Sequence, residues 1–254
     1  MSAEGATAPH NPMLRTLVMF DIDGTLLRGS QAGRAAYARA IETSCGIPVD
    51  MSGFQTAGKT DPAILRELLE RTGLSDVSVD ADGLLAAYLR HLEEGFRGDP
   101  GEVCPGVRDL LDTLSALAWV RLALGTGNLE QAAWMKLAAH GLAHYFATGG
   151  FGTDATQRAA ILAAGILKAQ ARYRMTFGRV VVVGDTPDDI ASAAANGVHS
   201  IGVATGPFSI DTLRRAGATL VLPDLSETAP FLRALQTLPP TPVGLAPRGQ
   251  SPDA

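Results

Sequence analysis

Buried-strand patterns alternate with helical patterns along most of the chain. Runs dense in Leu, Val, Ile or Ala, each ending in a polar or glycine-containing turn, predict buried strands. These runs cover residues 16–21, 119–126, 179–185 and 199–205, with a weaker one at 218–223. Helical spacing of apolar residues fills 105–117, 128–141, 156–173 and 187–197. This alternation predicts a three-layer α/β domain with a mostly parallel sheet.

The alternation of strand and helix patterns stops between residues 29 and 103, where no segment has a convincing strand pattern. Helical spacing recurs there at 31–46, 61–73 and 82–96. A crossover between parallel strands needs only one helix, whereas three helices with their own apolar faces can bury one another. We therefore expect an inserted helical cap at 29–103, and a core at 13–28 and 104–236. The alternative is that these helices pack directly on the sheet.

Composition and charge narrow the classes of function. The chain has 254 residues, 46% of them hydrophobic, which is enough for a substantial core. A net charge of -5, with scattered Lys and Arg, argues against a nucleic-acid surface. No apolar run reaches the roughly 18 residues of a membrane span. We expect a cytoplasmic protein, monomeric or homodimeric, that does not act on membranes, with disordered tails at 1–12 and 237–254.

Acidic and small residues gather where the predicted strands end. Asp21 and Asp23 close the first strand, residues 125–128 (Gly-Thr-Gly-Asn) close the second, and residues 184–189 (Gly-Asp-Thr-Pro-Asp-Asp) close a third. Ligands of parallel sheets bind at the carboxyl ends of the strands, so these segments should share one site. Carboxylates without His or Cys indicate a hard cation such as Mg²⁺, and Thr126 with nearby backbone N–H groups suits phosphate oxygens.

Three segments, in this order, resemble motifs of a known family. "DIDGTLL", "LALGTGN" and "VVVVGDTPDD" are similar to motifs one, two and four of the haloacid dehalogenase superfamily, and the resemblance spans about residues 16–222. It implies a Rossmann-like core with an inserted helical cap, as in phosphoglycolate phosphatase relatives. It also implies a Mg²⁺-dependent phosphatase that hydrolyses small phosphorylated metabolites.

The resemblance assigns roles residue by residue. Asp21 matches the nucleophile that forms an aspartyl-phosphate, and Asp23 matches the general acid and base. The metal ligands implied are Asp21, Asp185, Asp189 and the main-chain carbonyl of Asp23. Thr126 matches the phosphate-binding hydroxyl of the second motif. Substrate contacts are expected from Gly24, Thr25, Gly127 and Asn128.

The third motif departs from the family pattern. A Lys usually begins the helix before the strand of motif four, but here the basic residue at about the right distance is Arg158, and Lys168 lies too close to Asp185. We interpret Arg158 as the substitute, because a guanidinium can bridge carboxylate and phosphate; the alternative is a solvated helix Arg. In the cap, Lys59 precedes a helix that Thr60 or Asp61 caps, and we expect it to contact substrate, although it could equally be an ordinary exposed Lys.

Related activities remain open at this stage. A dehalogenase or phosphonatase is disfavoured because neither uses an acid two residues after the nucleophile, which is where Asp23 stands. A response-regulator receiver has an adjacent acidic pair and carries its phosphorylated Asp on a later strand. A phosphomutase retains both acids and stays an alternative, as does a phosphate-binding regulatory protein without turnover.

Overall fold

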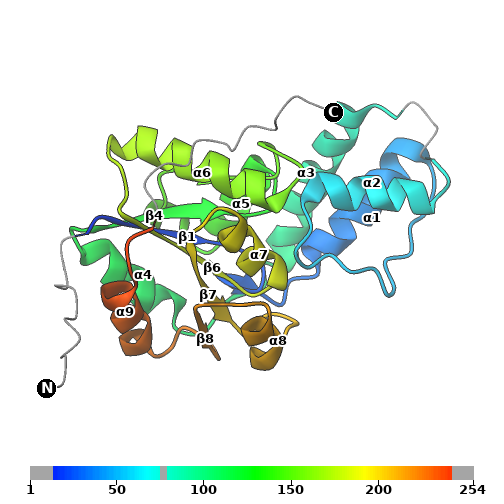
Figure 1. The fold of residues 1–254 in the computed structure, drawn as a ribbon. Helices are drawn as coiled ribbons and strands as arrows, with labels where there is room; N and C mark the ends of the chain where they lie inside the picture. The colour runs from blue at the N-terminus through cyan, green and yellow to red at the C-terminus, as the bar shows by residue number, and fades with distance from the viewer. Residues whose placement is uncertain (1–13, 75–78, 242–254) are drawn as a thin grey trace, which may run out of the picture.

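Residues 14–74 and 79–241 are described by the computed structural model. Six strands form a central sheet in the order β5-β4-β1-β6-β7-β8, and every neighbouring pair is parallel (Figure 1). The strands are β1 (Thr16–Phe20), β4 (Val120–Gly125), β5 (Gly149–Gly150), β6 (Arg179–Gly184), β7 (His199–Val203) and β8 (Leu220–Leu222). The predicted α/β class with a mostly parallel sheet is confirmed. Because β1 lies between β4 and β6, the loops after these three strands meet at one edge.

Helices cover both faces of the sheet, as alternation along β1 requires. Val18 and Phe20 face α4 (Val107–Ala116), α5 (Glu130–Ala139) and α9 (Thr228–Thr237). Leu17 and Met19 point to the opposite face, where they pack with α6 (Arg158–Tyr173) and α7 (Pro187–Ala195). The short helices are η1 (Ala143–Tyr145) and α8 (Ile210–Arg215). Successive side chains of a strand point to opposite faces, so a strand buried on both sides is apolar throughout.

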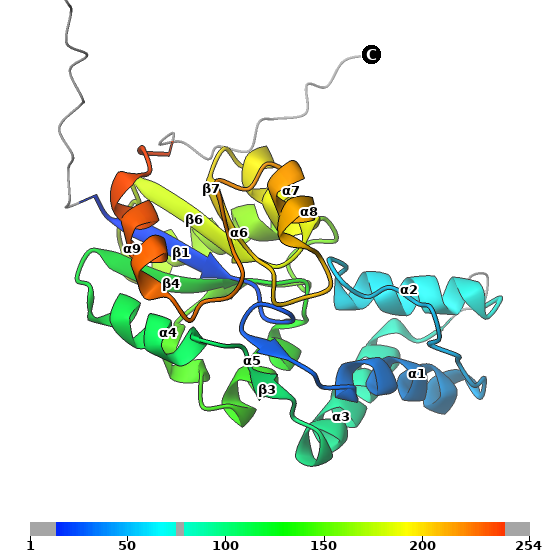
Figure 2. The ribbon, with the colours of Figure 1, turned by 90° about the horizontal axis from the view of Figure 1, so that it is seen from below.

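Three helices follow the first strand in the sequence and lie together to one side of the sheet, at the right of Figures 1 and 2. They are α1 (Ala32–Cys45), α2 (Asp61–Arg71) and α3 (Ala81–Gly98), and all three fall where the spacing predicted helices. Two short antiparallel strands, β2 (Leu27–Arg28) and β3 (Glu102–Val103), join this unit to the core. We call residues 29–101 the cap.

The cap has an apolar cluster of its own. Its centre is the stacked pair Tyr37 and Tyr88, whose ring centroids lie 4.6 Å apart. Leu129 and Ala132, which belong to the core segment around α5, join the same cluster. The cap is therefore both self-packed, as an inserted unit must be, and docked on the core.

Some elements were not predicted from the sequence. Strand β5 is two glycines, and a Cβ atom at Gly150 would lie 2.1 Å from the carbonyl oxygen of Ile161, so only glycine allows α6 to approach. Strands β2 and β3 have two residues each, too few for a pattern.

The last described residues overlap the start of the predicted C-terminal tail. Thr237 ends α9, and Thr241 is buried, with its backbone N–H donating to the Gly178 carbonyl at 2.9 Å. The structure thus differs from the expected disorder over residues 237–241, while 1–12 and 242–254 lie outside the described residues. None of the helices within the described ranges has the length and apolar character needed to cross a membrane.

Candidate active site

The turn after β1 brings two carboxylates to the rim of the sheet. The backbone N–H of Asp21 donates to Val183 at 2.9 Å, which continues the pairing of β1 with β6, and its side chain is buried. The chain then turns at Gly24, whose φ of +85° lies in the left-handed region. A Cβ atom at Gly24 would stand 2.3 Å from Oδ2 of Asp185. Glycine is required here both by the backbone conformation and by the approach of that carboxylate.

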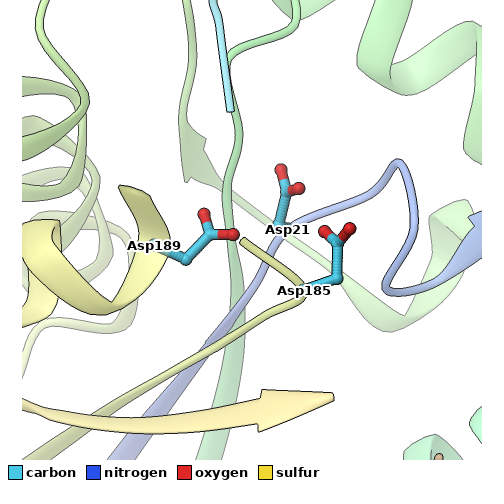
Figure 3. Close-up of side chains that lie close together, drawn as sticks. All are labelled: Asp21, Asp185 and Asp189. Carbon is cyan, nitrogen blue, oxygen red and sulfur yellow. The ribbon is translucent and has the colours of Figure 1, made fainter. Parts of the chain in front are cut away.

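Three buried carboxylates converge beside this turn, and we call Asp21, Asp185 and Asp189 the acidic triad. One oxygen of each lies within 4.8 Å of the others. Figure 3 shows Asp21 and Asp185 side by side, with the carboxylate of Asp189 directed toward them. Asp189 is fixed by the capping box of α7, in which Oδ2 accepts from the backbone N–H of Thr186 at 3.1 Å and from its hydroxyl at 2.7 Å. The structure thus brings together the three side-chain carboxylates among the predicted metal ligands.

Burial and mutual repulsion dominate the electrostatics of the triad. Burial raises the pKa of Asp21 to about 7, with Arg158 opposing that shift and Asp189 adding to it. Burial likewise raises the pKa of Asp185 to about 9, reinforced by the charges of Asp21 and Asp189. Like charges packed in a low-dielectric site favour a cation among them, and an all-oxygen donor set suits a hard divalent ion. The residues therefore fit Mg²⁺.

Arg158, the predicted substitute for the motif-three Lys, reaches this cluster from the first turn of α6. Its guanidinium donates to Oδ1 of Asp189 and lies 3.6 Å from Oδ1 of Asp21, with 13% of its side chain exposed. Burial opposes its charge, but the facing carboxylates of Asp189 and Asp21 raise the pKa of Arg158. Lys168, by contrast, pairs with Asp154 at 2.7 Å. The alternative of a solvated helix Arg does not describe this geometry.

The loop after β4 supplies a hydroxyl, a glycine and an amide. Thr126 is buried, its hydroxyl oxygen accepts from the backbone N–H of Asn128 at 3.3 Å, and the hydroxyl opposes the rise in the pKa of Asp21. A Cβ atom at Gly127 would lie 2.5 Å from the carbonyl oxygen of Lys59, so glycine lets the cap approach. Nδ2 of Asn128 donates to Oδ2 of Asp23 at 2.9 Å. Asn128, which we expect to contact substrate, lines the cavity described below and is bonded there to the second carboxylate.

Asp23 has a partner that the sequence analysis missed, Lys136 of α5. The Lys136 side chain is buried, and its ammonium donates to both carboxylate oxygens of Asp23, at 2.6 and 2.9 Å. Desolvation in the cleft between core and cap raises the pKa of Asp23, although about half of its side chain is accessible, but the charge and hydrogen bonds of Lys136 and the amide of Asn128 hold the pKa below its ordinary value. One signal was present in the sequence: Lys136 lies one helical turn after Ala132, on the face that α5 buries.

The cap contributes two charged side chains: Lys59 lines the cavity, whereas Asp61 is buried against the core. Lys59 lines the cavity described below, with its ammonium paired with Glu67 and lying over the ring of Phe54. Asp61 is buried and bonds to the core, where its Oδ2 accepts from the backbone N–H of Leu129 at 2.8 Å. The helix cap of α2 is Thr60, whose hydroxyl accepts from the N–H of Ala63. Sequence reasoning considered Asp61 only as a helix cap and missed this contact.

A cavity of about 450 Å³ lies between the core and the cap. Its core side holds both acids of the first motif, Asp185, the loop after β4, Lys136 and Arg158. Its cap side holds Arg34, Tyr37, Gln55 and Lys59, and Arg28 of β2 lines it at the junction. Thr25 is fully buried beneath it, with its hydroxyl 3.4 Å from Asp185. The volume suits a small molecule, and charged groups line the cavity from both the core and the cap.

Relatives of this chain carry names that concern phosphoryl groups. It is 28% identical over 206 residues to the tyrosine-protein kinase PtkA of Mycobacterium tuberculosis, covering 81% of this chain and 67% of the relative. It is 27% identical over 248 residues to the probable phosphatase IndB of Dickeya dadantii, covering 91% of this chain and 99% of that protein.

Solved structures share the fold. A hydrolase from Pseudomonas syringae superposes with a TM-score of 0.64 at 22% identity, covering 88% of this chain and all of that one. The family match rests on the sequence itself, since residues 16–197 match the model of the haloacid dehalogenase-like hydrolases, as the motifs predicted. The chain therefore belongs to the haloacid dehalogenase-like hydrolase family.

Proposed function

We propose that this chain is a Mg²⁺-dependent phosphatase that hydrolyses small phosphate monoesters through an aspartyl-phosphate on Asp21. One observation carries the proposal. The carboxylates of Asp21 and Asp23 line the same cavity, where the guanidinium of Arg158 and the hydroxyl of Thr126 also stand. A nucleophile, a proton carrier and phosphate-binding donors are the parts that this reaction needs.

In the first half-reaction, an oxygen of Asp21 attacks phosphorus and the bond from phosphorus to the leaving oxygen breaks. Asp23 donates a proton to that oxygen, so the product leaves as an alcohol. Asp23 must hold a proton at that moment, although Lys136 and Asn128 lower its pKa in the ligand-free protein. The negative charge of a bound phosphate raises the pKa of a neighbouring carboxyl, which favours the protonated form when substrate is present.

In the second half-reaction, water attacks the phosphorus of the aspartyl-phosphate. Asp23, now a carboxylate, takes a proton from the water, the acyl-phosphate bond breaks, and Asp21 is regenerated with release of inorganic phosphate. Lys136 and Asn128 favour this ionised form of Asp23. Using one residue as acid and then as base restores the starting state after each turnover.

Groups at fixed positions would stabilise the negative charge of the bound phosphate. Arg158 supplies a permanent positive charge and a planar set of donors, and Thr126 with the backbone N–H of Gly127 supplies neutral donors, whereas the N–H groups of Gly24 and Thr25 donate to carbonyls of their own turn. Preorganised donors of this kind account for much of the rate in phosphoryl transfer. Arg158 therefore takes the part that a Lys has in other members of the family.

The metal would be held by the acidic triad together with the main-chain carbonyl of Asp23. When bound, Mg²⁺ supplies positive charge that offsets the triad and the phosphate. We propose further that Lys59 contacts the substrate, since it lines the cap side of the cavity, and that the substrate is a small phosphorylated metabolite, since the cavity holds about 450 Å³.

A phosphomutase is the second candidate, and the docked cap favours it. The backbone N–H of Asp61 donates to the Gly127 carbonyl at 2.9 Å, and its side chain bonds Leu129, so the cap is tied to the loop beside the site. A cap held down in this way would shield an aspartyl-phosphate from water. A phosphate binder without turnover is the remaining alternative.

Hydrolysis of 4-nitrophenyl phosphate by purified protein separates these candidates. A phosphatase predicts Mg²⁺-dependent release of inorganic phosphate that is lost with chelator and in Asp21→Asn. Absence of phosphate release from folded wild type that binds Mg²⁺ would contradict the phosphatase and favour the other two. Asp211→Asn, an exposed acid on α8, is the matched control and should keep wild-type turnover.

A further inference from the structure

Lys136 is a buried cation on the core side of the cavity. Only 5% of its side chain is exposed, and its helix neighbours Ala132, Ala133 and Leu137 belong to the apolar core. Burying an ammonium costs several kcal/mol unless it is paired, so a Lys at such a position needs a carboxylate beside it. The carboxylate that it bonds directly is the acid and base of the proposed reaction, Asp23.

Asp23 differs from the acidic triad in having an exposed side chain. About 55% of it is accessible, whereas Asp21, Asp185 and Asp189 are buried. An exposed Asp at a turn can move between staggered rotamers, and proton transfer requires a heavy-atom separation of about 2.6–3.2 Å from the reacting oxygen. Some group must therefore restrict where this carboxylate points.

Two donors from the core provide that restriction. The ammonium of Lys136 bonds both oxygens of Asp23, and the amide of Asn128 bonds Oδ2 at 2.9 Å. Both donors are themselves fixed, because Lys136 projects from a packed helix and Asn128 lies in the loop that holds the cap. The same amide lies 3.4 Å from Oδ1 of Asp61, a buried cap carboxylate whose charge also acts on Lys136.

We propose that Lys136 is a positioning residue of the reaction, which holds Asp23 where it can pass a proton to the leaving oxygen. The proposal rests on the proposed function and adds a residue to it. Lys136 acts through Asp23 and takes no bond-making part. Substitution of Lys136 should slow ester cleavage most when the leaving group needs a proton, and least when the leaving group departs readily as an anion.

The test compares Lys136→Met with wild type on two substrates of similar shape, phenyl phosphate and 4-nitrophenyl phosphate. Phenol has a pKa of about 10 and leaves poorly without a proton, while the nitro group makes the second leaving group more acidic. The measured quantity is kcat/KM, which reports steps up to cleavage of the ester bond. We expect kcat/KM for phenyl phosphate to fall about tenfold further than for 4-nitrophenyl phosphate, a part of the roughly 10²–10⁴ that general acid–base catalysis supplies.

Two further variants keep the test decisive. Lys168→Met removes a Lys–carboxylate pair that lies outside the cavity and should leave the ratio of the two substrates unchanged. Lys136→Gln keeps a polar group and serves if the Met variant does not fold. Equal losses on both substrates, no loss in a folded variant, or failure of both Lys136 variants to fold while Lys168→Met folds would each overturn the proposal. Wild type that hydrolyses neither substrate would instead contradict the proposed function.

Discussion

The crowding of carboxylates at the site predicts that metal-free protein loses stability as the pH rises. An Asp has a usual pKa of 3.8, but in the folded protein the pKa of Asp21 is about 7 and that of Asp185 about 9. Between the unfolded and folded pKa values, the folded state binds more protons than the unfolded state, and stability then falls with rising pH. The window runs from about pH 4 to about pH 9, with a slope of roughly 1.4 kcal/mol per pH unit for each carboxyl.

Asp185→Asn isolates this effect, because an amide of the same shape cannot ionise. At pH 8 folded Asp185 is still largely protonated, and taking up a proton that the unfolded chain has released costs up to roughly 6 kcal/mol, from about four pH units at 1.36 kcal/mol each; removing this carboxyl also relieves Asp21. We expect the variant, in chelator, to gain at least about 2 kcal/mol over wild type at pH 8, and much less at pH 5, which lies only about one unit above the pKa of an Asp in the unfolded chain. Added Mg²⁺ should stabilise wild type at pH 8 and have much less effect on the variant.

Denaturant unfolding at pH 5 and pH 8, with and without Mg²⁺, measures both quantities. Asp211→Asn, which removes an exposed carboxylate, is the control and should follow the wild-type pH dependence. If Asp185→Asn and wild type show the same pH dependence in chelator, Asp185 does not lie buried among like charges, and the reasoning about the metal site is wrong.

Three further substitutions test the groups around the site. Arg158→Met should lower kcat/KM on an aryl phosphate by about 10²–10³, and Arg158→Lys should recover a large part of that loss; full activity in the Met variant would exclude a role in phosphate binding. Gly127→Ala places a Cβ atom 2.5 Å from the Lys59 carbonyl, so we expect a loss of about 1–3 kcal/mol in unfolding free energy, and unchanged stability would contradict the close cap contact. Lys59→Ala should alter relative kcat/KM values across a panel of phosphorylated metabolites while Mg²⁺ dependence persists; an unchanged ranking would remove Lys59 from substrate recognition.

Much of the core could be predicted because its signals are local. The apolar runs of β1 and β6 are buried on both faces, and the carboxyl end of a parallel strand is a known place for ligands. The convergence of Asp21, Asp185 and Asp189 follows from strand order once β1 and β6 are neighbours. These residues were found from pattern and resemblance together.

Lys136 and Asp61 were not found, because their surroundings depend on how the cap docks on the core. Lys136 meets Asp23 only in the folded protein, where the turn after β1 brings that carboxylate next to α5. Asp61 begins a helix, where an acid is ordinary, and its bond to the Leu129 backbone joins segments 68 residues apart. Burial of a charged side chain is a property of the packed molecule, and periodicity reports only which face of a helix is apolar.

The most direct test of the central claim is to find the phosphoryl group on Asp21. In Asp23→Asn the proton donor and acceptor is removed while the nucleophile stays, so an activated substrate such as 4-nitrophenyl phosphate should phosphorylate the protein faster than water releases it. Mass spectrometry after an acid quench measures the mass added to the peptide that contains Asp21. We expect a phosphorylated Asp21 that is absent from Asp21→Asn and from samples with chelator. Phosphate on another residue, or unmodified Asp21 in a folded variant that still consumes substrate, would contradict it.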